Sequence, residues 1–286
     1  MTAKTGAGAC HFRVNRNTAC SPNRFQNHQG ALTPTLPPAS RTNTFLLGTG
    51  DAVLVDPGCP HEEELERLLA SLVAAREQMG RRVVAIWLTH HHPDHVGGLE
   101  WLRRELDCPV LCHPLTAERL AERGVAVDGH LAGGERIALG ENPPFALRVL
   151  HTPGHARGHL CFLEETRDVL IAGDMVAGFG TIVIDPPEGD MTDYLESLDR
   201  LADLRPQSLF PGHGPVSVDA EEKLRAYASH RRWREERVLA AWDGGLREPS
   251  SMLDEVYPEL ASSARPLAER QIVAHLTRLE RMGRLL

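Results

Sequence analysis

The stretch "IWLTHHHPDHVGG" at residues 86–98 places four histidines and one aspartate within six positions. An apolar run precedes these residues and a glycine pair follows them, a pattern typical of a strand that gives way to a helix. Such a loop can direct several side chains toward one point. Zinc takes imidazole nitrogen and carboxylate oxygen as ligands, and a catalytic site leaves one position to water. The stretch therefore predicts a metal site, and the alternative is a polar loop that is rich in histidine.

Three later strand ends also carry side chains that can bind a metal. "LHTPGHARGH" (150–159) offers His151, His155 and His159, "IAGDM" (171–175) offers Asp174, and "FPGHG" (210–214) offers His213. Each is weak evidence by itself, because a lone histidine is more often structural and a lone aspartate can cap a helix. Four strand ends with the same chemistry favour a metal site.

Strand-like and helix-like segments alternate through the first three quarters of the chain. Apolar runs at 42–48 and 52–58 flank "GTGD" and predict a hairpin, and leucines at helical spacing predict a helix at 61–80. Further strands are predicted at 82–90, 108–114, 145–154, 158–166, 168–174 and 208–214, and further helices at 96–106, 115–124 and 190–204. This alternation predicts an α/β protein with sheets covered by helices.

No strand-like run appears after about residue 221. Helices predicted at 221–242, 249–260 and 266–286 resemble a winged-helix unit with a truncated wing. This tail has 12 Lys and Arg against 11 Asp and Glu, so it lacks the basic character of a DNA-binding module. We expect it to pack on the preceding domain, where it would narrow a substrate channel or mediate a homodimer.

The composition of the whole chain sets further limits. A chain of 286 residues with 42% hydrophobic residues can bury a large core, and no apolar run of transmembrane length occurs, so no membrane partner is expected. The net charge of −8 gives no general attraction to nucleic acid. The six cysteines include no C-x-x-C pair, which favours reduced thiols in a cytoplasmic protein.

Residues 1–41 are predicted to form an irregular leader. The first 50 residues contain five Lys and Arg but no Asp or Glu, and "TPTLPPAS" (33–40) is typical of an extended connector. An acid-free start that contains arginine is also a feature of organelle transit segments, so a mitochondrial location is the alternative if the source is eukaryotic.

The order H-x-H-x-D-H, then "TPGH", "AGD" and "PGHG", resembles the metallo-β-lactamase-fold hydrolases from about Thr42 to Pro215. The resemblance implies an αββα sandwich at 42–220 with a dinuclear zinc site on one edge, followed by a helical winged-helix-like domain at 221–286. By position, it implies that one zinc ion is held by His90, His92 and His155, that the other is held by Asp94, His95 and His213, and that Asp174 bridges them. His91, His151 and His159 are not carried over as ligands.

The resemblance also implies a role for Asp56 in "VLVDPG", which would lie behind the ligands and orient one of them or the loop. The alternative is a turn residue before Pro57. Asp94 is the implied catalytic residue, which would orient the attacking water or carry a proton.

A narrower resemblance links "RTNTFLLG", "HTPGHARGHLCF", "DPPEGDMTDYLESL" and the tail to the lactamase-beta-2-like branch. Its animal members resemble endoribonucleases, and its fungal relatives act as thioesterases on polyketides held by a carrier protein.

The implied reaction is hydrolysis by a metal-activated water. We rank a small ester or thioester above RNA because of the net charge of −8. Penicillin-hydrolysing enzymes of this fold that use three histidines and one cysteine as ligands have the cysteine at the position of Asp174. The aspartate therefore argues against antibiotics as the native substrate.

Other functions remain as alternatives. Members of this fold with one iron are dioxygenases that act on persulfides, and di-iron members that reduce oxygen have glutamate at the position of His92. A metal-dependent binding protein that uses the tail is a non-enzymatic alternative.

We expect His90→Ala and Asp174→Ala each to abolish hydrolysis, because each removes a side chain that the resemblance assigns to the metal site. Activity and metal content of the purified variants measure this. A variant that keeps full activity and full metal content would contradict the assignment.

Overall fold

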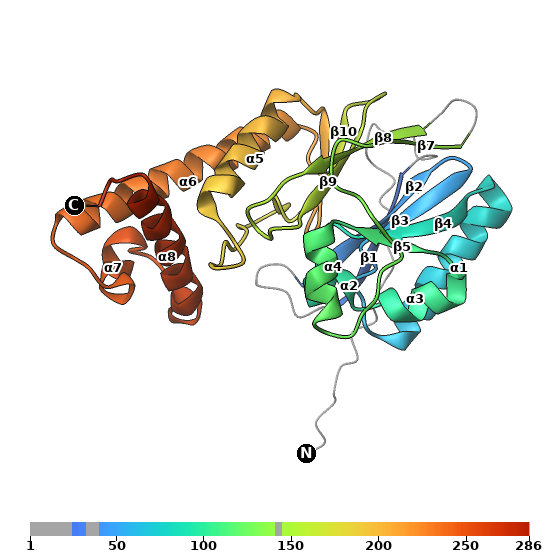
Figure 1. Cartoon of the computed structure of the whole chain (residues 1–286), viewed down its shortest axis with the longest axis horizontal. Coiled ribbons are helices and arrows are strands. Elements are labelled where there is room, and N and C mark those ends of the chain that lie inside the picture. Colours follow the sequence, from blue (N-terminus) through green and yellow to red (C-terminus); the bar gives the residue numbers. More distant parts are fainter. Residues whose placement is uncertain (1–24, 33–39, 141–144, 286) are drawn as a thin grey trace, which may run out of the picture.

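The structure, a computed structural model, describes residues 25–32, 40–140 and 145–285 (Figure 1). Two stacked sheets form its centre, and helices cover both outer faces. The first sheet has the order β1-β2-β3-β4-β5-β6, and the second has the order β11-β10-β9-β8-β7. This arrangement confirms the predicted αββα sandwich.

The first sheet consists of β1 (Phe25–Leu32), β2 (Arg41–Gly48), β3 (Asp51–Val55), β4 (Arg82–Trp87), β5 (Val110–Cys112) and β6 (Gly129–His130). The second sheet consists of β7 (Arg136–Leu139), β8 (Phe145–His151), β9 (Leu160–Glu164), β10 (Val169–Gly173) and β11 (Ser208–Pro211). The helices are α1 (Glu62–Met79), α2 (Pro93–Val96), α3 (Leu99–Leu106), α4 (Pro114–Ala121), α5 (Met191–Asp203), α6 (Ala220–Asp243), α7 (Pro249–Val256) and α8 (Arg265–Arg281), with a 3-10 turn at Ser262–Ala264.

Each sheet combines antiparallel and parallel pairing. In the first sheet β1, β2 and β3 are antiparallel neighbours, whereas β3 to β6 run parallel. In the second sheet only β10 and β11 are parallel. Parallel strands bring their carboxyl ends to the same edge, and the loops after β4, β10 and β11 carry predicted ligands.

Large aromatic side chains fill the space between the sheets. Trp87 of β4 packs on Phe162 of β9 with ring centroids 5.2 Å apart, and Phe45 of β2 meets Phe210 of β11 edge to face at 5.9 Å. All four are at most 4% exposed. Burial of aromatic area on this scale dominates core energetics, so these pairs fix the distance between the strand ends that carry the site.

Helix α6 belongs to two cores. Its first half buries Leu224 and Ala228 with α5 against the second sheet, and its second half buries Val238 and Ala241 with α7 and α8. The domain boundary is predicted between residues 220 and 221, where this helix begins, but the first half of the helix packs on the sandwich. The helical tail and the sandwich are therefore joined by one continuous helix.

The leader prediction for residues 1–41 is wrong for Phe25–Leu32, which forms β1 and pairs with β2. The segment "FQNHQGAL" lacks regular apolar alternation, so its strand depends on the free edge of β2. Residues 1–24 and 33–39, with Cys10 and Cys20, lie outside the described residues.

Other segment predictions need smaller changes. The helix predicted at 96–106 is interrupted at Gly97 and Gly98, so α2 and α3 are separate. The short strands β6 and β7 have no clear sequence signal. Cys108, Cys112 and Cys161 are buried free thiols, as predicted, and Cys59 is also buried. None of the helices in the described part of the chain is both long and apolar enough to cross a bilayer.

We expect Gly58→Ala to destabilise the fold by about 1–3 kcal/mol, because a Cβ atom there would lie 1.8 Å from the carbonyl oxygen of Asp94. Urea unfolding measures the change. Gly50→Ala is the matched control, since its nearest neighbour is the Cα of Gly140 at 3.7 Å, and it should stay within about 0.5 kcal/mol of wild type. Equal unfolding free energies for the two variants would contradict the prediction.

Candidate metal centre

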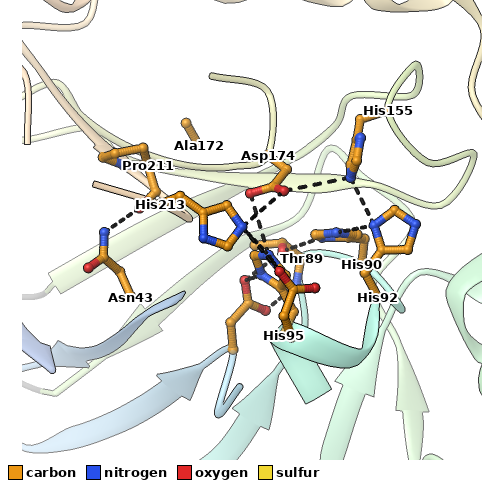
Figure 2. Close-up of polar contacts among 12 residues, drawn as sticks. Asn43, Thr89, His90, His92, His95, His155, Ala172, Asp174, Pro211 and His213 are labelled. Carbon is orange, nitrogen blue, oxygen red and sulfur yellow. Dashed lines mark hydrogen bonds and ion pairs between the residues drawn. The ribbon is translucent and has the colours of Figure 1, made fainter. Parts of the chain in front are cut away.

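The seven predicted ligands converge at one edge of the sandwich (Figure 2). The loop after β4 and the short helix α2 supply four of them, and the loops after β8, β10 and β11 supply the others. Three overlapping groups have ligand atoms within 4.8 Å of one another: His90, His92 and His155; His90, His95 and Asp174; and Asp94, His95 and His213. Residues far apart in the sequence thus meet in one cluster.

The first group is a ring of imidazole nitrogens. Nδ1 of His92 lies 3.0 Å from Nε2 of His90 and 2.9 Å from Nε2 of His155. Nδ1 of His155 donates a hydrogen bond to the carbonyl of Val183 at 2.8 Å. In the neutral ring, Nε2 of His155 therefore carries a lone pair that points into the cluster.

The tautomer of His90 follows from its neighbours. The Thr89 hydroxyl donates to Oδ2 of Asp56 at 2.6 Å, so its oxygen accepts from Nδ1 of His90 at 2.9 Å. Nε2 of His90 is then left with a lone pair, as in His155. Two such lone pairs face His92 at about hydrogen-bond distance.

The second group combines carboxylates with imidazoles. Nε2 of His213 lies 3.3 Å from Oδ2 of Asp94 and 3.4 Å from Nε2 of His95. The outer nitrogens are again donors, because Nδ1 of His95 donates to Oδ2 of Asp56 at 2.9 Å and Nδ1 of His213 donates to the carbonyl of Arg41 at 2.9 Å. Partners of this kind fix the ring orientation of metal-binding histidines.

Asp174 lies between the two groups. Its Oδ2 is 3.3 Å from Nε2 of His213 and 3.7 Å from Nε2 of His155, and its Oδ1 is 3.4 Å from Nε2 of His95. Oδ1 is buried and has no hydrogen-bond partner. A buried carboxylate oxygen without a partner is costly unless a cation neutralises it.

The pKa directions agree with this arrangement. Burial, together with the neighbouring His155, lowers the pKa of His92 to about 2, which keeps the ring neutral. Burial opposes the charged form of His213, but Asp174 and Asp94 raise its pKa to about 10. Burial also opposes ionisation of Asp174, yet His213 and His95 hold its pKa well below the usual range. A cation in the site would take the place of the protons that these carboxylates attract.

These residues fit a pair of divalent cations. The lone pairs of His90 and His155 both face Nδ1 of His92 at 2.9–3.0 Å, and one nitrogen can offer at most one proton to the two of them, whereas a cation would satisfy all three; Oδ1 of Asp174, which accepts no hydrogen bond, is suited to the same role. The donors are imidazole nitrogen and carboxylate oxygen, the set that zinc and other first-row metals accept. His91, His151 and His159 belong to none of the three groups. His151 instead stacks on His113, with ring centroids 4.1 Å apart.

Asp56 occupies the supporting position that the resemblance implied. It is 1% exposed, and besides the bonds from the Thr89 hydroxyl and His95 it accepts one from the Thr89 amide at 2.8 Å. This carboxylate therefore supports one ligand of each group, His95 directly and His90 through Thr89.

Sequence reasoning missed three supporting residues. Thr89 sets the tautomer of His90. His159 accepts from the Asp174 amide at 3.1 Å through Nε2 and donates to the Thr152 hydroxyl at 2.8 Å. Asn43 donates to the carbonyls of Pro211 and Gly214 at 2.9 and 2.8 Å, and so holds the loop of His213. Their only sequence signal was their place in or beside quoted motifs, because their partners are distant in sequence.

Comparisons with known proteins match both the sandwich and the helical tail. A model of the Metallo-beta-lactamase superfamily matches residues 37–213, and a model of the Beta-lactamase associated winged helix domain matches residues 249–285. The chain is 32% identical to Beta-lactamase-like protein 2 homolog of Drosophila melanogaster over 85% of this chain and 84% of that protein. It is 31% identical to atrochrysone carboxyl ACP thioesterase of Aspergillus fumigatus over 74% of this chain, but it spans only 63% of that protein.

Solved structures show the same architecture. A metallo-beta-lactamase family protein of Thermus thermophilus superposes with a TM-score of 0.73 at 26% identity, and the match covers 93% of this chain and 95% of that one. A second crystal structure, of a protein in a di-iron-bound form, is 33% identical with a TM-score of 0.50 over 66% of this chain and 94% of that one. The superposition on the Thermus thermophilus protein includes the helical tail as well as the sandwich.

We expect Asp56→Asn to weaken metal binding by about 10–100-fold, because Oδ1 of Asp56 accepts from the Thr89 amide while Oδ2 accepts from both the Thr89 hydroxyl and Nδ1 of His95, and the amide group of asparagine would place an NH2 donor against one of these two sets of donors. Zinc titration in competition with a chelating indicator measures the affinity. Asp128→Asn is the matched control, since Asp128 also accepts a backbone amide, that of Val110 at 2.8 Å, but is not part of the cluster. Equal zinc affinity in the two variants would contradict this role of Asp56.

Proposed function

Because the chain belongs to the metallo-beta-lactamase superfamily and is a metal-dependent hydrolase, we propose that it uses two zinc ions to hydrolyse an acyl thioester or a related small ester. One observation carries the proposal: the carboxylate of Asp174 lies between two groups of inward-facing nitrogen and oxygen atoms, and its buried Oδ1 accepts no hydrogen bond. Paired metal sites of this kind suit displacement of a leaving group by water.

In this proposal the residues are assigned to two ions as the sequence resemblance implied. His90, His92 and His155 would hold one ion, Asp94, His95 and His213 would hold the other, and Asp174 would contact both. When bound, such ions lower the pKa of a water toward neutrality and polarise the carbonyl of the substrate. The side chains of the protein supply the orientation, because their outer atoms are already committed to Val183, Thr89, Asp56 and Arg41.

The accessible side of the site indicates where substrate and water approach. Among the seven proposed ligands, only His92 and Asp94 are more than 9% exposed as residues, whereas the other five are buried. Asp94 directs Oδ2 toward His213 at 3.3 Å and sits at the open side. We therefore assign Asp94 the role of orienting the attacking water and accepting its proton, because a water that enters from the open side would come within hydrogen-bond distance of this carboxylate.

The thioester proposal rests on two supports. A relative that is 31% identical bears the name of an ACP thioesterase, although this chain spans 63% of its length. The thioester group that is cleaved is also uncharged, whereas every linkage of RNA carries a negative phosphate, which suits a chain with a net charge of −8 less well. RNA cleavage is an outcome that the substrate experiment below distinguishes.

Metal analysis of protein purified without added metal tests the cofactor. We expect about two zinc ions per chain, because the site has two donor groups. Two iron ions would match the di-iron form of the 33% identical structure and would overturn the zinc assignment. One iron ion per chain, together with oxygen consumption on a persulfide, would favour dioxygenase chemistry instead.

A hydrolysis screen tests the substrate. Zinc-loaded protein is given acyl-coenzyme A thioesters, lactones, β-lactams and single-stranded RNA, and kcat/KM is measured for each. We expect the thioesters to be the best substrates, with a loss of at least about 100-fold in Asp174→Asn. His130→Ala, which removes an exposed histidine outside the cluster, should retain wild-type activity. Preferential cleavage of RNA would replace the thioester proposal.

A further inference from the structure

The segment 177–190 connects the metal centre to the helical tail. It follows Asp174 closely, lacks regular secondary structure and ends at Asp190, the N-cap of α5. Its main chain contacts two proposed ligands: the amide of Gly178 donates to the carbonyl of His213 at 2.6 Å, and the carbonyl of Val183 accepts from Nδ1 of His155 at 2.8 Å. The position of Val183 therefore decides the orientation of a ligand.

Two buried polar side chains from the tail bind the main chain of the residues on either side of Val183. Gln271 of α8 donates to the carbonyl of Ile184 at 2.9 Å and accepts from the Ile184 amide at 3.3 Å. Arg231 of α6 donates to the carbonyl of Ile182 and to the Thr181 hydroxyl, the latter at 2.8 Å. Residues 182 and 184 are thus both bound to helices of the tail.

Arg231 and Gln271 also bind each other. Nη1 of Arg231 donates to Oε1 of Gln271 at 3.1 Å, and the two residues are only 2% and 5% exposed. Buried polar groups that are linked in this way lose their partners together when one is removed. The pair is therefore a rigid support rather than two independent surface contacts.

We propose that Arg231 and Gln271 are positioning residues for the metal centre, which act through Val183 on His155. By fixing the Val183 carbonyl, they keep the proton of His155 on Nδ1 and direct Nε2 toward the cluster. The helical tail then contributes to metal binding without supplying a ligand. This inference rests on the proposed assignment of His155 as a metal ligand.

The other contacts of the segment provide controls. Arg270, adjacent to Gln271 on α8, pairs with Asp185 on the same segment at 2.5 Å, but this pair is exposed and does not touch Val183. Met252 is fully buried in the core of the tail and lies in the cluster of α6, α7 and α8 rather than against the segment. Arg270→Gln therefore tests a contact with the segment itself, and Met252→Ala tests general destabilisation of the tail.

Zinc affinity provides the first test. Metal-free wild type and Gln271→Leu, which preserves side-chain volume, are titrated with zinc in competition with a chelating indicator. We expect one zinc equivalent to bind about 10–100-fold more weakly in Gln271→Leu, and the other to keep its affinity. Arg231→Lys keeps the positive charge but loses the planar guanidinium that donates to two partners at once. It should weaken binding of the same zinc equivalent, and it provides the test if Gln271→Leu does not fold. Arg270→Gln should bind both equivalents as wild type does.

Nitrogen NMR of the metal-free protein provides the second test. In wild type the ring nitrogens of His155 should show a single tautomer with the proton on Nδ1, and in Gln271→Leu they should show a mixture. This measurement needs no metal. If wild type binds no zinc, the proposed function fails, whereas the NMR result still decides whether the pair positions His155.

Three results would overturn the inference. The first is a folded Gln271→Leu protein with both wild-type zinc affinities. The second is an equal loss of affinity in Met252→Ala, which would make the effect one of general stability. The third is an unchanged His155 tautomer in Gln271→Leu.

Discussion

The buried carboxylate of Asp56 is the interaction on which the metal centre depends. It is 1% exposed, and its charge is balanced by the amide and hydroxyl of Thr89 and by Nδ1 of His95. A buried charge with three directed donors leaves little rotational freedom to any of them. Since Thr89 in turn fixes His90, one carboxylate at the end of β3 sets the tautomers of ligands in both groups.

Backbone carbonyls orient the remaining imidazoles. Val183 accepts from His155 and Arg41 accepts from His213, so two ligands depend on segments whose own side chains are not ligands. Close packing adds to this constraint, because a Cβ atom at Gly212 would lie 2.3 Å from Oδ1 of Asp174. The site is thus defined by how main-chain segments approach one another as well as by its seven donors.

The helical tail packs against the domain that carries the candidate metal centre. Helix α6 packs against α5 with its first half and against α7 and α8 with its second half. Because Arg231 lies on this helix and reaches the segment that orients His155, the tail and the metal centre are connected through two hydrogen-bonded steps. The tail has 12 basic and 11 acidic residues, so it carries almost no net charge.

The sandwich and the convergence of the seven candidate ligands were predictable because their signals are local. His90, His92, Asp94 and His95 lie within six positions, and each of the other ligands follows an apolar strand at a recognisable turn. Strand β1 was not predictable, since "FQNHQGAL" forms a strand only beside β2. Asn43, His159, Arg231 and Gln271 were not predictable as support for the site either, because a polar side chain gives no sign of a partner that is distant in sequence.

The sequence by itself therefore determined which side chains are candidate ligands, that each follows a predicted strand, and the helical nature of the tail. Tertiary structure decided which nitrogen of each histidine faces the centre, that Asp174 lies between the two groups, and that α6 and α8 reach His155 through Val183. The physical reason is range: periodicity and turn chemistry act over a few residues, whereas a tautomer is set by whichever acceptor the folded chain brings within about 3 Å.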